Sequence, residues 1–306
     1  MKLKLGLTKT AVLLISTLVT SLGIAASPSL AASLAVSRGS FTIDNYSQSP
    51  ENLANLPDDR SEAIAGSGSS VNTNGILTSA KGITSVTGRN VIADALALAS
   101  FSKDPLESFN FTSNVASGEG NTYFGLAQSE AKVAGDFSIK AGDIFSFDFT
   151  AFLELYTKLE NPFGEIATAS GELSLVLLDI TNQTVLDSFS VFSKIVTSAY
   201  AKPSEDVFSY DKSQNINIDF IKNLNFGSID KESATALFQG SYRRTFNSDT
   251  RLLLIETKTN KVTVQAPEPS STFALLFGFG VTGVFLGAKS KINRQGKLFS
   301  TGIDKV

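Results

Sequence analysis

The side chains that most enzymes use as nucleophiles and general bases are scarce in this chain. Its 306 residues contain no histidine and no cysteine. This composition excludes Ser-His-Asp and Cys-His nucleophiles, histidine general bases and nearly every zinc or copper site. Carboxylates remain, and Glu154, Glu160 and Glu165 could supply a pair that cleaves a glycosidic bond. Because a chain with 29 acidic residues offers many such pairs, we predict no catalytic residue and no enzyme.

Three further carboxylates, Asp136, Asp143 and Asp148, are close in sequence and could contribute to a Ca²⁺ site, since hard cations bind clustered oxygens. No compact loop of Asp, Asn and Gly surrounds them. Solvated carboxylates on loops and strand faces are therefore the favoured interpretation, and we predict neither a metal nor a cofactor.

Two features bear on carbohydrate binding. The adjacent Arg243 and Arg244 could hold an acidic sugar, although a solvent-facing strand or turn is the favoured interpretation. The chain has no tryptophan, which is the commonest flat platform for a sugar ring, but it has six tyrosines. The side chains alone therefore name no ligand.

Strands of alternating polarity must position these side chains. Phe145, Phe147 and Phe149 alternate with small or polar residues, which predicts a half-buried strand with its Phe side facing the core. The same period recurs in residues 173–177, 185–192 and 216–220. Ten or so short strands at this spacing predict an all-β, antiparallel two-sheet β-sandwich, with a jelly roll as the favoured topology.

Turns and loops separate the expected strands. Turn signals occur at residues 141–143, 161–164, 181–183 and 247–249. Residues 46–75 are rich in Ser, Asn, Asp, Gly and Pro, and we expect a long surface loop there. Residues 92–101 fit a helix about as well as a strand.

The N-terminus has the features of a secretory signal peptide. Lys2, Lys4 and Lys9 precede an apolar run over residues 11–24. Small residues then lead to a cleavage site after Ala31, with Ala35 as a second candidate. This pattern predicts export through the Sec translocon and cleavage by signal peptidase.

The C-terminus has the form of a membrane anchor. Residues 272–288 are 17 uncharged, mostly apolar residues, and a membrane-stop cluster of Lys289, Lys291, Arg294 and Lys297 follows them. Such a run, closed by positive charges, predicts a transmembrane helix with a cytoplasmic tail. Residues 258–271 read as an extended linker before this helix, because prolines at its end disfavour helix.

Directly before the apolar run stand Pro267, Glu268 and Pro269. A Pro-Glu-Pro triplet, an apolar helix and a basic cluster together resemble the sorting signal of the PEP-CTERM family. That resemblance implies an exported protein of a Gram-negative bacterium that makes exopolysaccharide, processed by the membrane enzyme exosortase. Residues 141–149 also resemble a strand of many cyanobacterial PEP-CTERM proteins and of carbohydrate-handling β-sandwich modules. The family would place the chain first in the inner membrane, then at the cell surface or in the extracellular matrix.

The predicted organisation is a signal peptide (1–31), an ectodomain (32–257), a linker (258–271), a transmembrane helix (272–288) and a cytoplasmic tail (289–306). Residues 32–266 carry 18 of the 26 basic residues and 27 of the 29 acidic ones, a net charge of −9. Such a domain repels phosphate backbones, so we predict that it does not bind nucleic acid. Without cysteine, the core alone must hold the fold.

Two function classes remain. The first is a surface or matrix protein of a biofilm that acts by non-catalytic binding, or as a structural component associated with exopolysaccharide. The second is a secreted carbohydrate-active enzyme that uses only carboxylates. The missing histidine favours the first.

Overall fold

The computed structural model describes residues 33–51, 60–64, 69–73, 76–88, 90–120 and 122–266. The chain divides into two compact units, Met1–Ala266 and Pro267–Val306. All described residues lie in the first unit. The expected signal peptide, the Pro-Glu-Pro triplet, the apolar run over residues 272–288 and the basic tail lie outside the described residues.

The described chain consists of β-strands joined by turns, with one 3₁₀ turn (Pro203–Glu205). In chain order, the strands are β1 (Ser33–Asp44), β2 (Arg60–Ile64), β3 (Ser69–Thr73), β4 (Ile76–Gly88), β5 (Val91–Lys103), β6 (Leu106–Gly118), β7 (Tyr123–Ile139), β8 (Ile144–Leu159), β9 (Ile166–Asp179), β10 (Thr184–Thr197), β11 (Val207–Lys212), β12 (Ile216–Asn225), β13 (Lys231–Thr245) and β14 (Thr250–Ala266). Among these residues, no helix has the length and hydrophobicity needed to cross a membrane.

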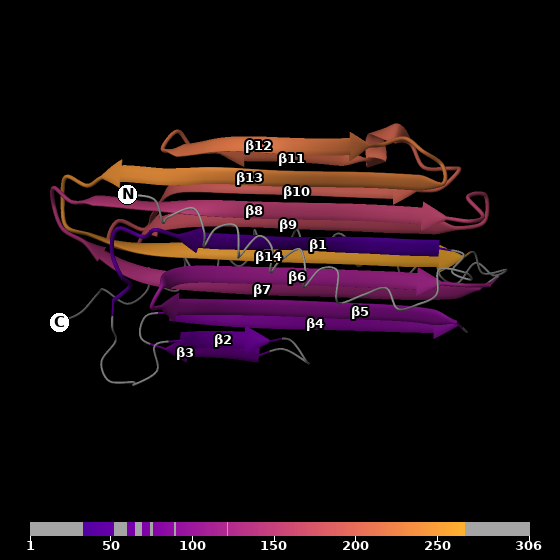
Figure 1. The fold of residues 1–306 in the computed structure, drawn as a ribbon, viewed down its shortest axis with the longest axis horizontal. Coiled ribbons are helices and arrows are strands. Elements are labelled where there is room, and N and C mark those ends of the chain that lie inside the picture. The colour runs from indigo at the N-terminus through magenta and orange to yellow at the C-terminus, as the bar shows by residue number, and fades with distance from the viewer. Residues whose placement is uncertain are drawn as a thin grey trace, which may run out of the picture. The chain divides into compact units, whose positions relative to one another are not determined.

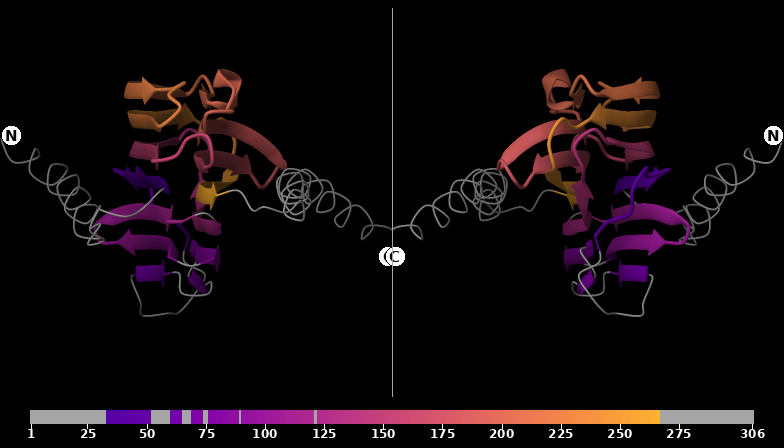
Figure 2. Two further views of the ribbon diagram at one scale, coloured as in Figure 1. Left: turned by 90° about the vertical axis from the view of Figure 1, so that its right-hand side faces the viewer. Right: turned by 90° about the vertical axis from the view of Figure 1, so that its left-hand side faces the viewer.

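The strands form two antiparallel sheets that pack face to face, as Figures 1 and 2 show. One sheet has the order β12-β13-β8-β1-β6-β5-β2, and the other has the order β11-β10-β9-β14-β7-β4-β3. The first strand, β1, and the last strand, β14, each occupy the middle of a sheet. Neither sheet is therefore complete until the first and the last strand are both in place.

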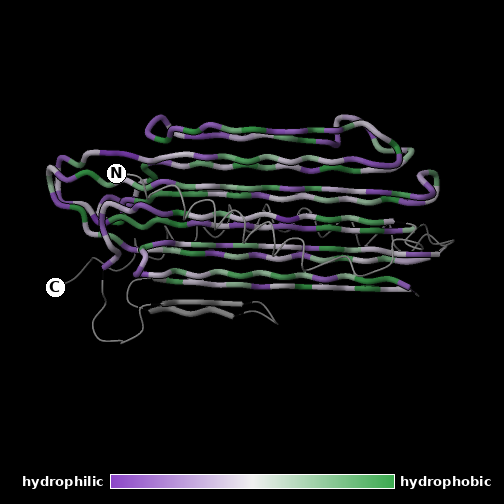
Figure 3. The backbone as a smooth tube through the Cα atoms, viewed as in Figure 1, coloured by the Kyte–Doolittle hydropathy of each residue, from purple (hydrophilic) through white to green (hydrophobic). Residues whose placement is uncertain are grey.

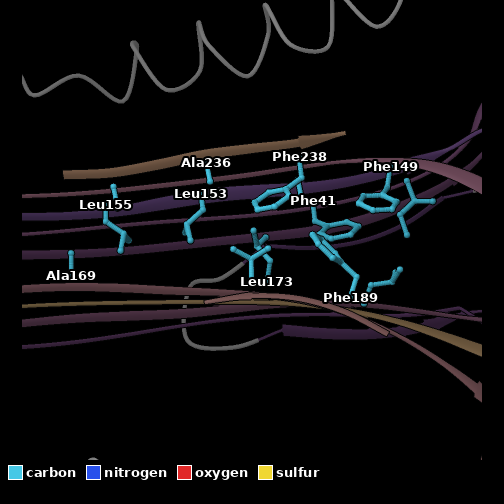
Figure 4. Packing of buried hydrophobic residues seen from close by; sticks show 14 of the residues in the cluster. Phe41, Phe149, Leu153, Leu155, Ala169, Leu173, Phe189, Ala236 and Phe238 are labelled. Carbon is cyan, nitrogen blue, oxygen red and sulfur yellow. The ribbon is translucent and has the colours of Figure 1, made fainter. Parts of the chain in front are cut away.

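Alternating side chains build the core between the sheets. Figure 3 shows the alternation of hydrophobic and hydrophilic residues along the strands. Phe145, Phe147 and Phe149 are at most 3% exposed, which confirms the predicted core face of β8. Phe41 of β1 stacks on Phe149 with ring centroids 5.5 Å apart, and Phe189 of β10 packs against both rings (Figure 4). Burial of these rings is the main source of stability in a chain without disulfides.

Several expectations hold at the level of single elements. All four predicted turns fall between strands, and residues 92–101 belong to strand β5 rather than to a helix. The two-sheet antiparallel sandwich is confirmed. The strands are more numerous and longer than expected: there are fourteen in the described residues, and six of them have 14 to 17 residues. Two seven-stranded sheets also exceed the eight strands of a jelly roll.

Two loop predictions were wrong. The expected loop over residues 46–75 contains β2 and β3, which pair with β5 and β4 at one edge of the sandwich. Edge strands form through backbone hydrogen bonds to one neighbour, so their sequences need no strong apolar alternation. Residues 258–266 are not a linker, because β14 continues to Ala266 between β7 and β9. The folded unit therefore ends at Ala266, and the predicted boundary at residue 257 falls inside β14.

Candidate ligand-binding site

The structure separates the three glutamates that could have formed a catalytic pair. Glu154 lies within β8, and its carboxylate is 3.9 Å from the guanidinium of Arg38. Glu160 and Glu165 both lie in the β8–β9 loop, where Glu160 is exposed and Glu165 is only 4% exposed. Burial raises the pKa of Glu165, while hydrogen bonds from the Asn161 amide and Tyr123 act in the opposite direction. Glu160 is thus the one carboxylate of the three that lies in this loop and is exposed to solvent, so the three do not form an exposed pair.

The three aspartates considered for Ca²⁺ each have another partner. Arg251 Nε donates to Asp136 at 3.0 Å, Asn45 Nδ2 donates to Asp148 at 2.9 Å, and Gln48 Nε2 donates to Asp143 at 3.4 Å. Within the part of the chain that the structure describes, no group of three or more acidic side chains could hold a metal ion.

The two neighbouring arginines of β13 have different environments. Arg243 is exposed, as expected for a solvent-facing strand residue. Arg244 Nη1 donates to the carboxylate of Asp187 at 2.9 Å, and Tyr242 donates to the same carboxylate at 3.1 Å. Asp187 is 3% exposed and belongs to β10 of the other sheet. Arg244 therefore links the two sheets, and its guanidinium group is not free to bind an acidic sugar.

Two exposed aromatic rings meet at one end of the sandwich. Phe163 lies in the β8–β9 loop and is 68% exposed, and Tyr200 lies in the β10–β11 loop and is 76% exposed. Their ring centroids are 6.4 Å apart, and the ring planes meet at 79°. Large aromatic side chains are usually buried, so a pair exposed on adjacent loops marks a surface suited to binding.

Backbone hydrogen bonds hold the two aromatic loops together. The Ala199 amide donates to the carbonyl of Pro162 at 2.9 Å, which links the loops one residue away from each ring. The Gly164 amide donates to the Asn161 carbonyl at 3.0 Å and closes the β8–β9 turn. The loops are therefore tied to each other, so the rings are displayed in a fixed relation.

A carboxyl pair, half-buried Asp206 and buried Glu232, anchors the β10–β11 loop. Asp206 accepts from the amides of Val196 (2.9 Å) and Gly227 (3.2 Å). Glu232 accepts from the same Gly227 amide at 2.7 Å and from Thr197 Oγ1 at 2.7 Å. Burial raises the pKa of Glu232 to about 7, and the hydrogen bond to Asp206 and the negative charge of Asp206 add to the rise. Glycosidase carboxyls stand at least about 5 Å apart, so this bonded pair is better suited to fixing the loop.

The aromatic pair was not among the sites predicted from the sequence. The available signal was an aromatic residue inside the Asn-Pro-Phe-Gly turn, since a turn between two alternating strands places its side chain in solvent. The second ring, Tyr200, lies 37 positions further along the chain, so only the strand pairing shows that the two meet.

Comparison with known proteins adds little. No family model matches the chain. No curated protein matches it either. Among solved structures, it is similar to the translocator domain of the autotransporter NalP from Neisseria meningitidis, with 10% identity, a TM-score of 0.17, and coverage of 85% of this chain and 96% of that one. A similarity of this size supports no conclusion about fold or function.

Proposed function

We propose that this chain is an exported surface or matrix protein that binds polysaccharide without cleaving it. The observation that carries the proposal is the exposed pair of Phe163 and Tyr200 on two loops that are bonded to each other. Two ring planes at 79° offer one face and one edge, which is a platform for the apolar faces of sugar rings.

The charge of the ectodomain selects among polysaccharides. Residues 32–266 carry a net charge of −9, which repels uronic acids and sulfated sugars. Arg244, the cation considered for an acidic sugar, is engaged by Asp187. A neutral polysaccharide is therefore the proposed ligand.

The terminal sequences suggest how the protein reaches the cell surface. The Pro267–Pro269 triplet would be the element that exosortase reads, and residues 272–288 would present it at the inner membrane before the protein reaches the surface. The end of β14 at Ala266 supports this proposal, because the triplet begins at the first residue after the sandwich. Because proline disfavours helix, a Pro-Glu-Pro sequence directly after a folded unit is suited to recognition by a processing enzyme.

The start of β1 favours Ala31 over Ala35 as the signal-peptidase site. Cleavage after Ala31 leaves the whole of β1 on the mature protein. Cleavage after Ala35 would remove Ser33, whose hydroxyl accepts from Tyr123 at 2.7 Å, and would also remove Ala35, which is fully buried.

The test uses fragment 32–266, which contains every described strand. Wild type should bind neutral polysaccharides on a glycan array and release no reducing ends from them. Phe163→Ala and Tyr200→Ala should each weaken binding, while Ile221→Ala should not. Ile221 is as exposed as Tyr200 but lies on β12, so it is a matched control for loss of exposed apolar surface.

The alternative function is that of a carboxylate-only carbohydrate-active enzyme. One observation favours the enzyme: the exposed carboxylate of Glu160 lies in the same β8–β9 loop as Phe163. Release of reducing ends that stops in Glu160→Gln or Glu165→Gln would establish the enzyme and overturn the binding proposal.

A further inference from the structure

A strip of polar side chains runs through the middle of the sandwich, between strand β6 of one sheet and β14 of the other. Alternate residues of each strand point inward, so the strip consists of Ser108, Asn110, Thr112 and Asn114 from β6, and Glu256, Lys258 and Asn260 from β14. All seven are at most 1% exposed. The described residues form two apolar clusters, a main core and a small cluster around Phe101, and Tyr46 packs against both.

The two strands of the strip contact each other directly. The carboxyl group of Glu256 accepts from Ser108 and from Asn110 Nδ2, and Asn114 Nδ2 donates to the Asn260 carbonyl at 2.6 Å. Both strands lie near the middle of their sheets, as Figure 1 shows. These bonds across the interior fix the facing positions of the polar side chains.

Small residues on the neighbouring strands make space for the side chains of the strip. A Cβ placed on Gly39 would lie 2.2 Å from Lys258 Nζ, so the amine occupies the space that a side chain on β1 would fill. A Cβ on Gly171 would lie 3.0 Å from Asn260 Oδ1. Ala97, which pairs with Thr112, and Ala131, which pairs with Lys258, are also small.

Eight polar atoms at or beside the strip have no hydrogen-bond partner among the described protein groups. They are Thr78 Oγ1, Asn110 Oδ1, Thr112 Oγ1, Asn114 Oδ1, Ser129 Oγ, Lys258 Nζ, and both Nδ2 and Oδ1 of Asn260. The two atoms from other strands are in register with the strip, since Ser129 pairs with Asn260 and Thr78 lies beside Val133, the partner of Glu256.

Such atoms need partners of some kind. A buried donor or acceptor that lacks one loses its hydration without compensation, and eight together would exceed the margin by which a domain of this size is stable. The chemistry of the atoms identifies the partner. Hydroxyl, amide and amine groups can donate, while three amide oxygens can only accept. A metal ion would satisfy the acceptors alone and an anion the donors alone, whereas water does both.

We propose that the strip between β6 and β14 binds a cluster of ordered water molecules inside the sandwich. A buried water makes about three hydrogen bonds, so eight atoms require at least about three waters. Water beside Lys258 also gives its amine a partner while keeping it out of contact with the apolar core. The waters act as part of the fold and couple the two sheets through the polar strip.

Magnetic relaxation dispersion of water oxygen, measured on fragment 32–266, counts long-lived internal waters. Wild type should show about three or more. Thr112→Val combined with Ser129→Ala removes two of the eight atoms and should lower the count by one or more. Thr157→Val is the matched control, because the Thr157 hydroxyl is buried but already bonded to Thr197, and it should leave the count unchanged.

A wild-type count of zero would overturn the proposal, and so would a double variant with the wild-type count. If the double variant does not fold, Ser129→Ala alone and the wild-type count decide the question. A crystal structure of wild type should show water density between Thr112, Lys258 and Asn260. Density for an organic molecule or a metal ion there would contradict the proposal.

Discussion

Replacement of Glu256 by glutamine should change how the stability of the two-sheet domain depends on pH. Glu256 is fully enclosed between the sheets, and burial raises the pKa of its carboxyl group to about 8, against the opposing effect of the Ser108 hydrogen bond. The folded state therefore keeps the proton between pH 4.5 and 8, whereas the unfolded chain has lost it. The stabilisation that comes from this bound proton is fully present below pH 4.5 and is lost as the pH rises through 8.

The size of the effect follows from linkage. One proton bound only by the folded state changes the free energy of unfolding by about 1.4 kcal/mol per pH unit. Between pH 5 and 8, wild type should therefore lose about 4 kcal/mol relative to Glu256→Gln, which cannot titrate. All other titrating groups are shared by the two proteins and cancel in the difference, while any constant cost of the substitution leaves the slope unchanged.

The assay is urea unfolding of fragment 32–266 at pH 5, 6, 7 and 8, for wild type and variant. Lys258→Met supplies a control of opposite sign. Burial lowers the pKa of Lys258 well below its usual value, so at this site the folded state binds fewer protons than the unfolded chain. The contribution of Lys258 to the free energy of unfolding therefore rises with pH up to about 10.5. A pH-independent difference between wild type and Glu256→Gln would show that the carboxyl is ionised in the fold, and would refute this account of the interior.

Three further predictions concern the core, the domain boundary and the tail. Phe147→Ala should lower the free energy of unfolding by about 3–5 kcal/mol, and Ser146→Ala by far less; equal losses would contradict a one-sided core strand. A fragment that ends at residue 257 should fail to fold, because it lacks residues 258–266 of the central strand β14, while one that ends at Ala266 should show cooperative unfolding; folding of both would contradict the central place of β14. Replacing Pro267–Pro269 should leave the tail attached in membrane fractions analysed by mass, and Glu268→Gln alone tests whether its charge is read. Normal processing after loss of the whole triplet would refute the sorting assignment.

Part of the fold could be predicted because its signal is local. The alternation of Phe145, Phe147 and Phe149 shows which side chains face the core, and the turn residues between strands act over three or four positions. Strand β14 escaped prediction for a physical reason. Its inward residues Glu256, Lys258 and Asn260 are polar, so the middle of a central strand has the composition of a surface segment. The partners that make this tolerable are on β6, about 150 positions earlier.

The candidate site was also beyond the reach of the sequence. Phe163 and Tyr200 are ordinary loop residues until the pairing of β9 with β10 brings their loops to the same end of the sandwich. The carboxylates, in contrast, drew attention because they are numerous, and the structure places several of them in ion pairs. Asp136 with Arg251 and Asp187 with Arg244 are two such cases.

The central claim is that the aromatic pair binds neutral polysaccharide. Its most direct test is the dissociation constant of fragment 32–266 for a neutral exopolysaccharide, measured by calorimetry for wild type, for Phe163→Ala combined with Tyr200→Ala, and for Ile221→Ala. Aromatic anchors at binding sites each contribute about 1–2 kcal/mol or more, so the double variant should bind at least about 30-fold more weakly, with the control unchanged. Equal affinities for all three proteins would contradict the claim.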